Sequence, residues 1–232
     1  MVDVQGVLDQ MKICILIPCH NEAKAIGPLL SKLKVFGLDV VVVDDGSGDG
    51  TGDIARGQGA FVVAIPKRGG KGNAMQKGFD HIVSKGYDAL IVMDGDGQHS
   101  VEDVPAFIDR YKATQASVIN GNRMANNKNM PFGRRVTNRF MSWMVSCVCG
   151  QRIPDSQCGF RLISCGVLRA IKLTSTNFEI ETEILIKASK KGFKIDSVPI
   201  QTIYEDEQSK IHPVKDTVRF FKYLMRELSS HD

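Results

Sequence analysis

The sequence lacks a long apolar run, a paired cysteine motif and the pattern of a secretory signal peptide. Because no run approaches the roughly 18 to 20 apolar residues that a membrane span needs, we expect no transmembrane helix and only peripheral membrane contact. The six cysteines lie mostly inside apolar stretches and form no C-x-x-C pair, which is typical of reduced core thiols. These absences favour a cytoplasmic protein, with any membrane contact at the cytoplasmic face.

Strong charge of one sign is also absent over the whole chain, but the two halves differ. The 232 residues, 43% hydrophobic and 24% charged, carry a net charge of +4 and are enough for one large folded domain. Residues 1–116 hold 12 Lys and Arg against 15 Asp and Glu, and residues 117–232 hold 18 against 11. The second half therefore suits an anionic partner. No nucleic-acid-binding motif is present, and nothing indicates an obligate protein partner.

Short apolar runs alternate with helical patterns through the first half, which predicts an α/β fold with a mostly parallel sheet flanked by helices. The runs are almost free of polar residues, as expected for strands covered on both faces. Ligands of such open sheets bind beyond the carboxyl ends of the strands, so functional residues should follow the runs. The expected strands are 12–17, 39–44, 60–65, 89–94 and 116–121, and the expected helices are 24–35, one from Thr51, and 71–84.

The second half has a different composition. A loop rich in glycine and asparagine is expected at 126–133, followed by helices at 134–149, 178–191 and 213–228 and a strand at 193–204. The helix at 134–149 carries an apolar stripe headed by arginines, and the helix at 213–228 is basic and amphipathic. Each pattern suits packing on the domain as well as contact with an anionic membrane. The stripe consists of Val136, Phe140, Trp143, Met144 and Cys147.

The segment GGKG at 69–72 resembles a phosphate-binding loop without matching one. A Walker A motif needs glycine where Ile65 stands and Ser or Thr after Lys71, where Gly72 stands. A dinucleotide site is also disfavoured, because the first turn after a strand has no glycine to admit a pyrophosphate. Lys71 can still contact a phosphate as a point charge.

The segment DGDGQH at 94–99 places two carboxylates at the end of an expected strand. It is not an EF-hand loop, because His99 stands where that loop needs glycine. Carboxylate and amide oxygens suit Mg²⁺ or Mn²⁺, which makes Asp94, Asp96 and Gln98 candidate metal ligands. An acidic turn that merely ends the strand gives the same pattern, so the choice depends on Asp45 and the other strand ends.

The order of seven segments resembles that of family 2 glycosyltransferases of the GT-A fold, most of all the dolichyl- or polyprenyl-phosphate mannose and glucose synthases. The resemblance covers about residues 12 to 228. The segments are ILIPCHNEAKAI, VVVDDGSGDGT, RGGKGNAMQKGF, MDGDGQH, NGNRM, DSQCGFR and YEDEQSKI.

The resemblance implies a nucleotide-sugar-binding portion at 12–123 and an acceptor-binding portion of the same domain at 124–232, after an N-terminal extension at 1–11. It implies that Asp45 contacts the base and that Asp94, Asp96 and Gln98 hold the divalent cation. The implied donor-binding residues are Pro18, His20, Glu22, Asp45, Lys71, Asp94, Gly95, Asp96 and Gln98.

The acceptor side is implied in the same way. Arg123 would lie near the phosphates, and Asp155 would orient the nucleophile. Asp96, Arg123 and Asp155 are thus the expected catalytic residues. Tyr204 and Glu207 depart from the family pattern, in which arginine and glycine are usual. The implied acceptor-binding residues are Arg123, Arg135, Arg139, Arg161, Ser209 and Lys210.

The expected activity is metal-dependent, inverting transfer of mannose or glucose from GDP-mannose or UDP-glucose to dolichyl or polyprenyl phosphate. A phosphate monoester with a second pKa near ~6 is already largely anionic at neutral pH and needs no strong base. If the acceptor is instead a sugar hydroxyl of a glycan, Glu179 or Glu181 would serve as base. An inactive nucleotide-sugar-binding module is the alternative from another class.

Overall fold

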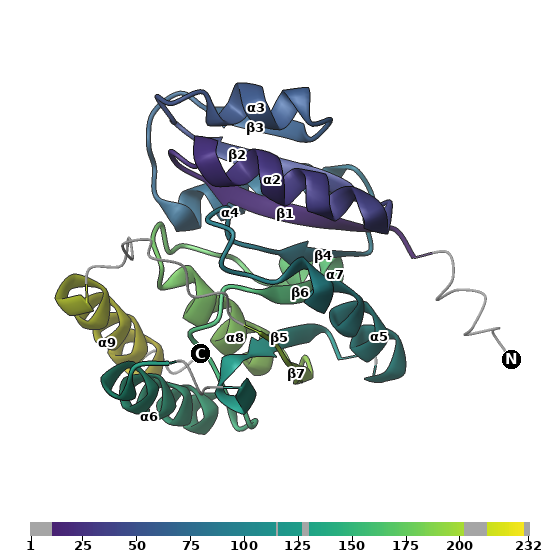
Figure 1. Ribbon diagram of the computed structural model, residues 1–232. Coiled ribbons are helices and arrows are strands. Elements are labelled where there is room, and N and C mark those ends of the chain that lie inside the picture. Colours follow the sequence, from purple (N-terminus) through teal and green to yellow (C-terminus); the bar gives the residue numbers. More distant parts are fainter. Residues whose placement is uncertain (1–10, 115, 127–129, 202–212, 230–232) are drawn as a thin grey trace, which may run out of the picture.

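The computed structural model describes residues 11–114, 116–126, 130–201 and 213–229, and their strands form one mixed sheet with helices on both faces (Figure 1). The strand order is β3-β2-β1-β4-β6-β5-β7. The predicted α/β class and mostly parallel sheet are confirmed. The strands are β1 (Ile13–Cys19), β2 (Asp39–Asp45), β3 (Phe61–Ile65), β4 (Ala89–Val92), β5 (Val118–Asn122), β6 (Arg161–Ser164) and β7 (Ile195–Pro199).

The helices agree with the predicted pattern at most positions. Helices α5 and α7 were not predicted, and α6 begins at Phe132, inside the segment predicted as a loop. None of the described helices combines the length and the apolar character that a membrane span requires. The helices are α2 (Ala23–Leu33), α3 (Thr51–Gly57), α4 (Lys71–Ser84), α5 (Val104–Thr114), α6 (Phe132–Cys149), α7 (Cys165–Ala170), α8 (Ile180–Lys190) and α9 (Pro213–Ser229).

Strand β6 is antiparallel to both of its neighbours, β4 and β5, whereas the other pairs are parallel. Its first residue, Arg161, pairs with Val92 at the end of β4 and with Asn120 in β5. The chain therefore enters β6 at the edge of the sheet where β4 ends. This reversal brings the segment 155–160 beside the residues that follow β4.

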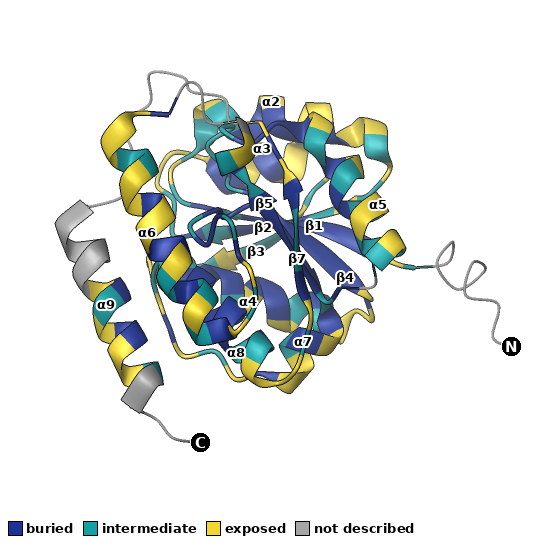
Figure 2. Cartoon of the chain, turned by 90° about the horizontal axis from the view of Figure 1, so that it is seen from below, coloured by how far each residue is buried: buried dark blue, intermediate teal, exposed yellow. Residues whose placement is uncertain are grey.

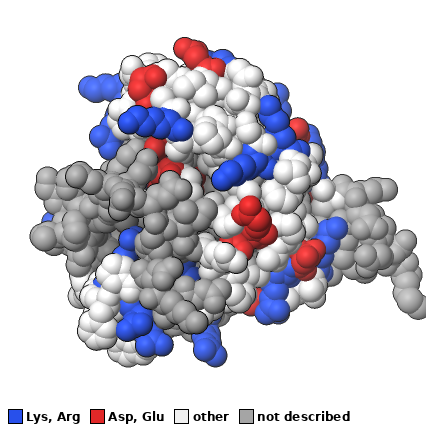
Figure 3. Space-filling view, in the orientation of Figure 1, with Lys and Arg blue, Asp and Glu red and all other residues white. Residues whose placement is uncertain are grey.

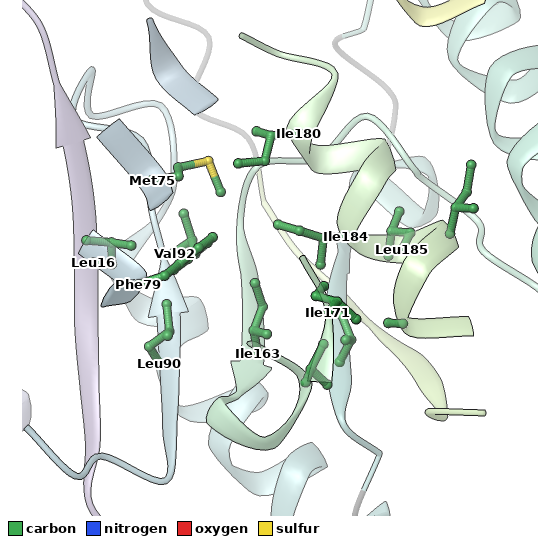
Figure 4. Packing of buried hydrophobic residues seen from close by; sticks show 14 of the residues in the cluster. Leu16, Met75, Phe79, Leu90, Val92, Ile163, Ile171, Ile180, Ile184 and Leu185 are labelled. Atoms are coloured by element: carbon green, nitrogen blue, oxygen red, sulfur yellow. The ribbon is translucent and has the colours of Figure 1, made fainter. Parts of the chain in front are cut away.

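Alternate residues of the central strands fill two cores, one on each face of the sheet. In β1, Leu16 belongs to the core under α4 and α8, whereas Ile15 and Ile17 belong to the core under α2 and α5. Figure 4 shows the first of these cores, in which Met75 and Phe79 of α4 lie beside the strands. All six cysteines are free and five are buried, as predicted from their apolar surroundings.

Helix α4 packs so closely on the sheet that Gly78 has no room for a side chain. A Cβ atom there would lie 2.4 Å from Leu16 Cδ1 and 3.0 Å from Val43 Cγ2. These two side chains, carried by the neighbouring strands β1 and β2, are fully buried. The close approach fixes α4, and with it the lysine at its first position, relative to β1 and β2.

We expect Gly78→Ala to destabilise the protein by about 1 kcal/mol. Overpacking costs about 1–3 kcal/mol, which exceeds the gain of about 0.8–1 kcal/mol that alanine brings to a helix interior. Urea denaturation monitored by circular dichroism measures the difference. Gly57→Ala is the control, since nothing lies within 4 Å of a Cβ at that helical position, and it should not destabilise the fold. Equal or greater stability of Gly78→Ala would contradict the packing argument.

Candidate active site

The turns that follow β1 and β2 are joined by hydrogen bonds at the carboxyl edge of the sheet. Asn21 has a left-handed backbone, with φ of 55°, a conformation that asparagine adopts more readily than most residues. Its backbone N–H donates to Ser47 Oγ at 2.9 Å, and its side-chain Oδ1 accepts from the Gly48 N–H at 2.9 Å. The Glu22 N–H donates to Thr51 Oγ1 at 2.8 Å. These bonds hold the two turns as one unit.

Asp45 connects the turn after β1 with the turn before α4. Its carboxylate, in a residue only 3% exposed, accepts from the N–H groups of Gly69 at 2.7 Å and Gly70 at 2.8 Å. Its carbonyl oxygen accepts from His20 Nδ1 at 2.8 Å, so Nδ1 carries a proton. Asp45 thereby positions both the His20 ring and the turn before α4. Its predicted contact with a nucleotide base stays a prediction, as do the donor roles of His20 and Pro18.

Three charged groups meet where α4, β4 and α8 converge. Lys71 Nζ lies 2.6 Å from Asp94 Oδ1 and 2.7 Å from Glu181 Oε1. The Lys71 side chain is 15% exposed and that of Glu181 is 10% exposed. Gly159, just before β6, closes the cluster, because a Cβ there would lie 2.9 Å from Asp94 Oδ2 and 3.0 Å from Glu181 Oε1. The cluster joins residues 110 positions apart in the chain.

The pKa values of the two aspartates in DGDGQH are shifted in opposite directions. Burial would raise the pKa of Asp94, but the Lys71 ammonium group outweighs it and holds that pKa below its ordinary value. Burial and the charge of Asp94 raise the pKa of Asp96 above its ordinary value. Gly95 between them packs tightly, since a Cβ there would lie 2.5 Å from Cys19 Sγ. The pair thus carries more negative charge than the one nearby ammonium group compensates.

His99 packs against this turn. Its Nδ1 accepts from the Asp94 N–H at 3.2 Å, and its ring stacks on Phe160 with centroids 4.9 Å apart. Burial lowers the pKa of His99 to about 4, so the ring is neutral at neutral pH. The sequence analysis did not assign His99 a role, although its place directly after the acidic pair was a usable signal.

The donor set at this edge fits a divalent cation. Asp94, with a side chain 28% exposed, and Asp96 offer carboxylate oxygens, and Gln98 is partly exposed beside them. Hard oxygen donors of this kind suit Mg²⁺ or Mn²⁺. Within the described residues no group of three His, Cys, Asp or Glu side chains could hold a metal. Gln98 and oxygens of a bound diphosphate would therefore have to complete the coordination.

Arg123 and Asp155 form a buried ion pair that the sequence analysis did not predict. Arg123 Nε lies 2.8 Å from Asp155 Oδ2, and Arg123 Nη2 lies 2.9 Å from Asp155 Oδ1. Asp155 has no exposed surface, and its backbone carbonyl accepts from Asn120 Nδ2. The pairing raises the pKa of Arg123, although burial alone would lower it. Asp155 therefore reaches Arg123 and not the surface, and its predicted part in orienting the nucleophile stays a prediction.

The predicted acceptor arginines occupy quite different places. Arg161 has no exposed surface and donates to the backbone carbonyls of Glu181 at 2.7 Å and Cys158 at 2.5 Å. Its guanidinium group is wholly buried, and its predicted contact with an acceptor stays a prediction. Arg135 and Arg139 lie on α6, partly buried and exposed respectively. Ser209 and Lys210, together with Tyr204 and Glu207, lie outside the described residues.

The two glutamates considered as alternative bases also differ in position. Glu181 belongs to the Lys71 cluster, whereas Glu179 Oε2 is buried without a hydrogen-bond partner. Only Glu181 is thus brought beside Asp94. Spacing alone could not separate the two, since they stand two residues apart at the start of α8.

We expect Asp155→Ala to destabilise the protein by about 3–5 kcal/mol, because it leaves the buried Arg123 guanidinium group unpaired. Asp196→Ala is the matched control. It removes a similar two-point pair with Arg110, at 2.9 and 3.1 Å, in which the arginine side chain is 46% exposed. Exposed pairs contribute about 1 kcal/mol or less. Urea denaturation compares the two variants, and equal losses of stability would contradict the assignment of Asp155 as a buried structural partner.

The sequence is similar to a known protein family and to proteins named as sugar transferases. A family model described as glycosyl transferase family 2 matches residues 14–172. The chain is 31% identical over 202 residues to an undecaprenyl-phosphate mannosyltransferase of Micrococcus luteus, covering 82% of this chain and 83% of that protein. It is 30% identical over 217 residues to a UDP-N-acetylglucosamine–dolichyl-phosphate N-acetylglucosaminyltransferase of Methanococcus voltae, covering 84% and 86% of the two chains.

Solved structures confirm the fold. Glucosyl-3-phosphoglycerate synthase of Mycobacterium tuberculosis in complex with UDP superposes with a TM-score of 0.78 at 17% identity, over 99% of this chain and 84% of that one. The same enzyme with Mn²⁺, UDP and phosphoglyceric acid gives a TM-score of 0.74 at 16% identity, over 98% and 81%. At this identity the likeness shows a shared GT-A architecture and nothing about substrates.

Proposed function

The chain belongs to glycosyl transferase family 2 and is a glycosyltransferase, and from this premise we propose that it transfers a hexose from a nucleotide sugar to a polyprenyl phosphate. The observation that carries the proposal is the carboxylate pair Asp94 and Asp96 at the edge of a family 2 fold whose relatives are named for polyprenyl-phosphate acceptors. The sugar we propose is mannose or glucose, carried by GDP or UDP. Transfer proceeds with inversion at the anomeric carbon.

The donor half of the proposal rests on the carboxyl edge of the sheet. The fixed turns around His20 and Asp45 would receive the nucleoside, and Asp94, Asp96 and Gln98 would hold a divalent cation against the diphosphate. A bound cation would offset the charge that develops as the nucleoside diphosphate leaves. We propose that residues 12–123 form this donor portion and that residues 124–232 form the acceptor portion.

The acceptor half rests on chemistry and on arginine placement. A polyprenyl phosphate is an anionic nucleophile at neutral pH, so the site needs cations to orient it more than a base to activate it. Arg123 is held rigidly by Asp155, and its guanidinium group is geometrically suited to phosphate oxygens. We propose Arg123, Arg135 and Arg139 for this role.

A surface on α6 suits a peripheral position at the cytoplasmic face of a membrane. The surface consists of Phe132, Val136, Phe140 and Trp143, which are 71%, 50%, 50% and 61% exposed. Most of the stripe predicted from the sequence therefore faces outward, while Met141 and Val145 face the core. Figures 1 and 2 both show α9 beside α6. Figure 3 has the orientation of Figure 1, and at its lower left, where these helices lie, Lys and Arg stand next to uncharged atoms. Aromatic and basic groups together favour an anionic lipid surface.

Transfer to a sugar hydroxyl is the second candidate, because Glu181 lies beside Asp94 through Lys71. A hydroxyl acceptor needs a general base within hydrogen-bond reach. In the present geometry Glu181 Oε1 is already engaged by Lys71, which favours the phosphate acceptor.

Turnover on defined acceptors tests the proposal. GDP-mannose, UDP-glucose and UDP-N-acetylglucosamine are each incubated with Mn²⁺ and either undecaprenyl phosphate or a soluble oligosaccharide, and lipid products are identified by mass spectrometry. We expect sugar-bearing lipid, its loss on chelation with EDTA, and a decrease of at least about 100-fold in kcat for Asp96→Asn, since electrostatic stabilisation of this kind contributes about 10²–10³.

The control for this assay is Asp53→Asn, whose carboxylate is 85% exposed in a surface pair with Arg56. It removes a negative charge from the same half of the chain and should leave kcat unchanged. Transfer to the oligosaccharide but never to the lipid would contradict the proposed acceptor. Unaltered turnover of Asp96→Asn would contradict the proposed metal ligand.

The membrane surface is tested with phosphatidylglycerol vesicles. We expect the double variant Phe140→Glu, Trp143→Glu to bind them at least about tenfold more weakly, because each large apolar side chain buried in lipid contributes about 1.5–3 kcal/mol. Vesicle co-sedimentation gives the partition constants. Val35→Glu is the control, since Val35 is 78% exposed outside α6. If both variants bind as the unaltered protein does, α6 is not the contact surface.

A further inference from the structure

The Lys71 cluster holds a cation where the proposed donor site would bring another. The Lys71 ammonium group bonds Asp94 at 2.6 Å and Glu181 at 2.7 Å, and Asp94 is one of the proposed ligands of the divalent cation. An ammonium group and a divalent cation compete for the same carboxylate oxygen when both are present. A few ångströms between like charges is a large electrostatic cost in a partly buried site.

No other described cation replaces Lys71 in this place. Arg123 is paired with Asp155 through its Nε and Nη2 donors. Arg161 Nη2 lies 4.0 Å from Glu181 Oε2, and the Arg161 guanidinium group donates to two backbone carbonyls. His99 Nε2 lies 3.9 Å from Asp94 Oδ2, much farther than the 2.6 Å that separates Lys71 Nζ from Asp94 Oδ1. The charge of Asp94 is therefore compensated chiefly by Lys71.

The backbone at Lys71 is fixed by its neighbours, whereas the side chain has rotatable bonds of its own. Lys71 is the first residue of α4, and the two residues before it are held by Asp45. The residue after it, Gly72, touches the chain at 175–177, because a Cβ there would lie 2.5 Å from the Ser175 carbonyl oxygen. The ammonium group stands on a flexible four-carbon stem. It can change partners without any movement of α4.

We propose that Lys71 is the exchangeable counter-cation of the donor site: it neutralises Asp94 and Glu181 while the site is empty and turns to the diphosphate when nucleotide and divalent cation bind. This inference rests on the proposed function and adds a form of regulation to it. A divalent cation that binds alone must displace Lys71 from Asp94 or lie close to its ammonium group. A diphosphate that binds alone and attracts Lys71 leaves the carboxylates of Asp94 and Glu181 without a counter-charge. Together they exchange partners with Lys71, so each ligand should strengthen the binding of the other, by the same factor in both directions.

The test measures Mn²⁺ affinity by electron paramagnetic resonance, with and without saturating UDP or GDP, in the unaltered protein and in Lys71→Gln. In the unaltered protein we expect nucleoside diphosphate to tighten Mn²⁺ binding by at least about tenfold. In Lys71→Gln we expect Mn²⁺ alone to bind about tenfold more tightly than in the unaltered protein, because a competing charge is gone. We expect UDP or GDP to bind this variant more weakly and the coupling factor to shrink toward one.

Lys77→Gln is the control, because Lys77 is exposed on the same helix and its loss removes an equal charge. It should leave Mn²⁺ affinity and coupling unchanged. If Lys71 only holds the fold together, Lys71→Gln lowers the melting temperature without tightening Mn²⁺ binding, and that result overturns the inference. Weaker Mn²⁺ binding by Lys71→Gln, or undiminished coupling, overturns it as well.

The same measurement separates this inference from the proposed function. If the unaltered protein binds Mn²⁺ and nucleoside diphosphate cooperatively and Lys71→Gln keeps the full coupling, the donor site stands and the role of Lys71 fails. If the unaltered protein binds no Mn²⁺ at Asp94 and Asp96 under any condition, both fail together.

Discussion

The contact of Lys71 with Asp94 and Glu181 is the interaction on which the geometry of the site depends. It joins the start of α4, the end of β4 and the start of α8, and so connects the two halves of the chain at one point. Without the ammonium group, two carboxylates would face each other in a partly buried space, which is costly. Neighbouring residues hold the three charged groups in position. Asp45 fixes the turn before Lys71, and Gly159 leaves room for all three groups.

The parallel part of the fold was predictable because its signals are local. Runs such as VVVV at 40–43 are apolar and β-branched, and the start of α4 at Lys71 directly follows two glycines. The antiparallel insertion of β6 between β4 and β5 was not predictable in this way. Strand order depends on which edges are left to be covered, and a four-residue strand carries no sign of its partners.

The site was predictable in its acidic residues and not in its pairings. Asp94 and Asp96 stand at a strand end, and their neighbours repeat a family pattern. The Asp155 partner of Arg123 and the Glu181 partner of Arg161 lie 32 and 20 residues away in the chain, and only the fold brings them together. Both arginines looked like phosphate ligands in the sequence. The two arginines differ in burial. Arg123, paired with Asp155, is 9% exposed, and Arg161 has no exposed surface.

The central claim is that the carboxyl edge holds a cation and a diphosphate together, and anomalous diffraction from crystals grown with Mn²⁺ and UDP or GDP tests it most directly. The account predicts a manganese peak within bonding distance of the Asp96 carboxylate, with a diphosphate bound to it and Lys71 Nζ moved from Asp94 to a phosphate oxygen. A nucleotide bound elsewhere, or bound with no manganese at Asp94 and Asp96, would contradict the account.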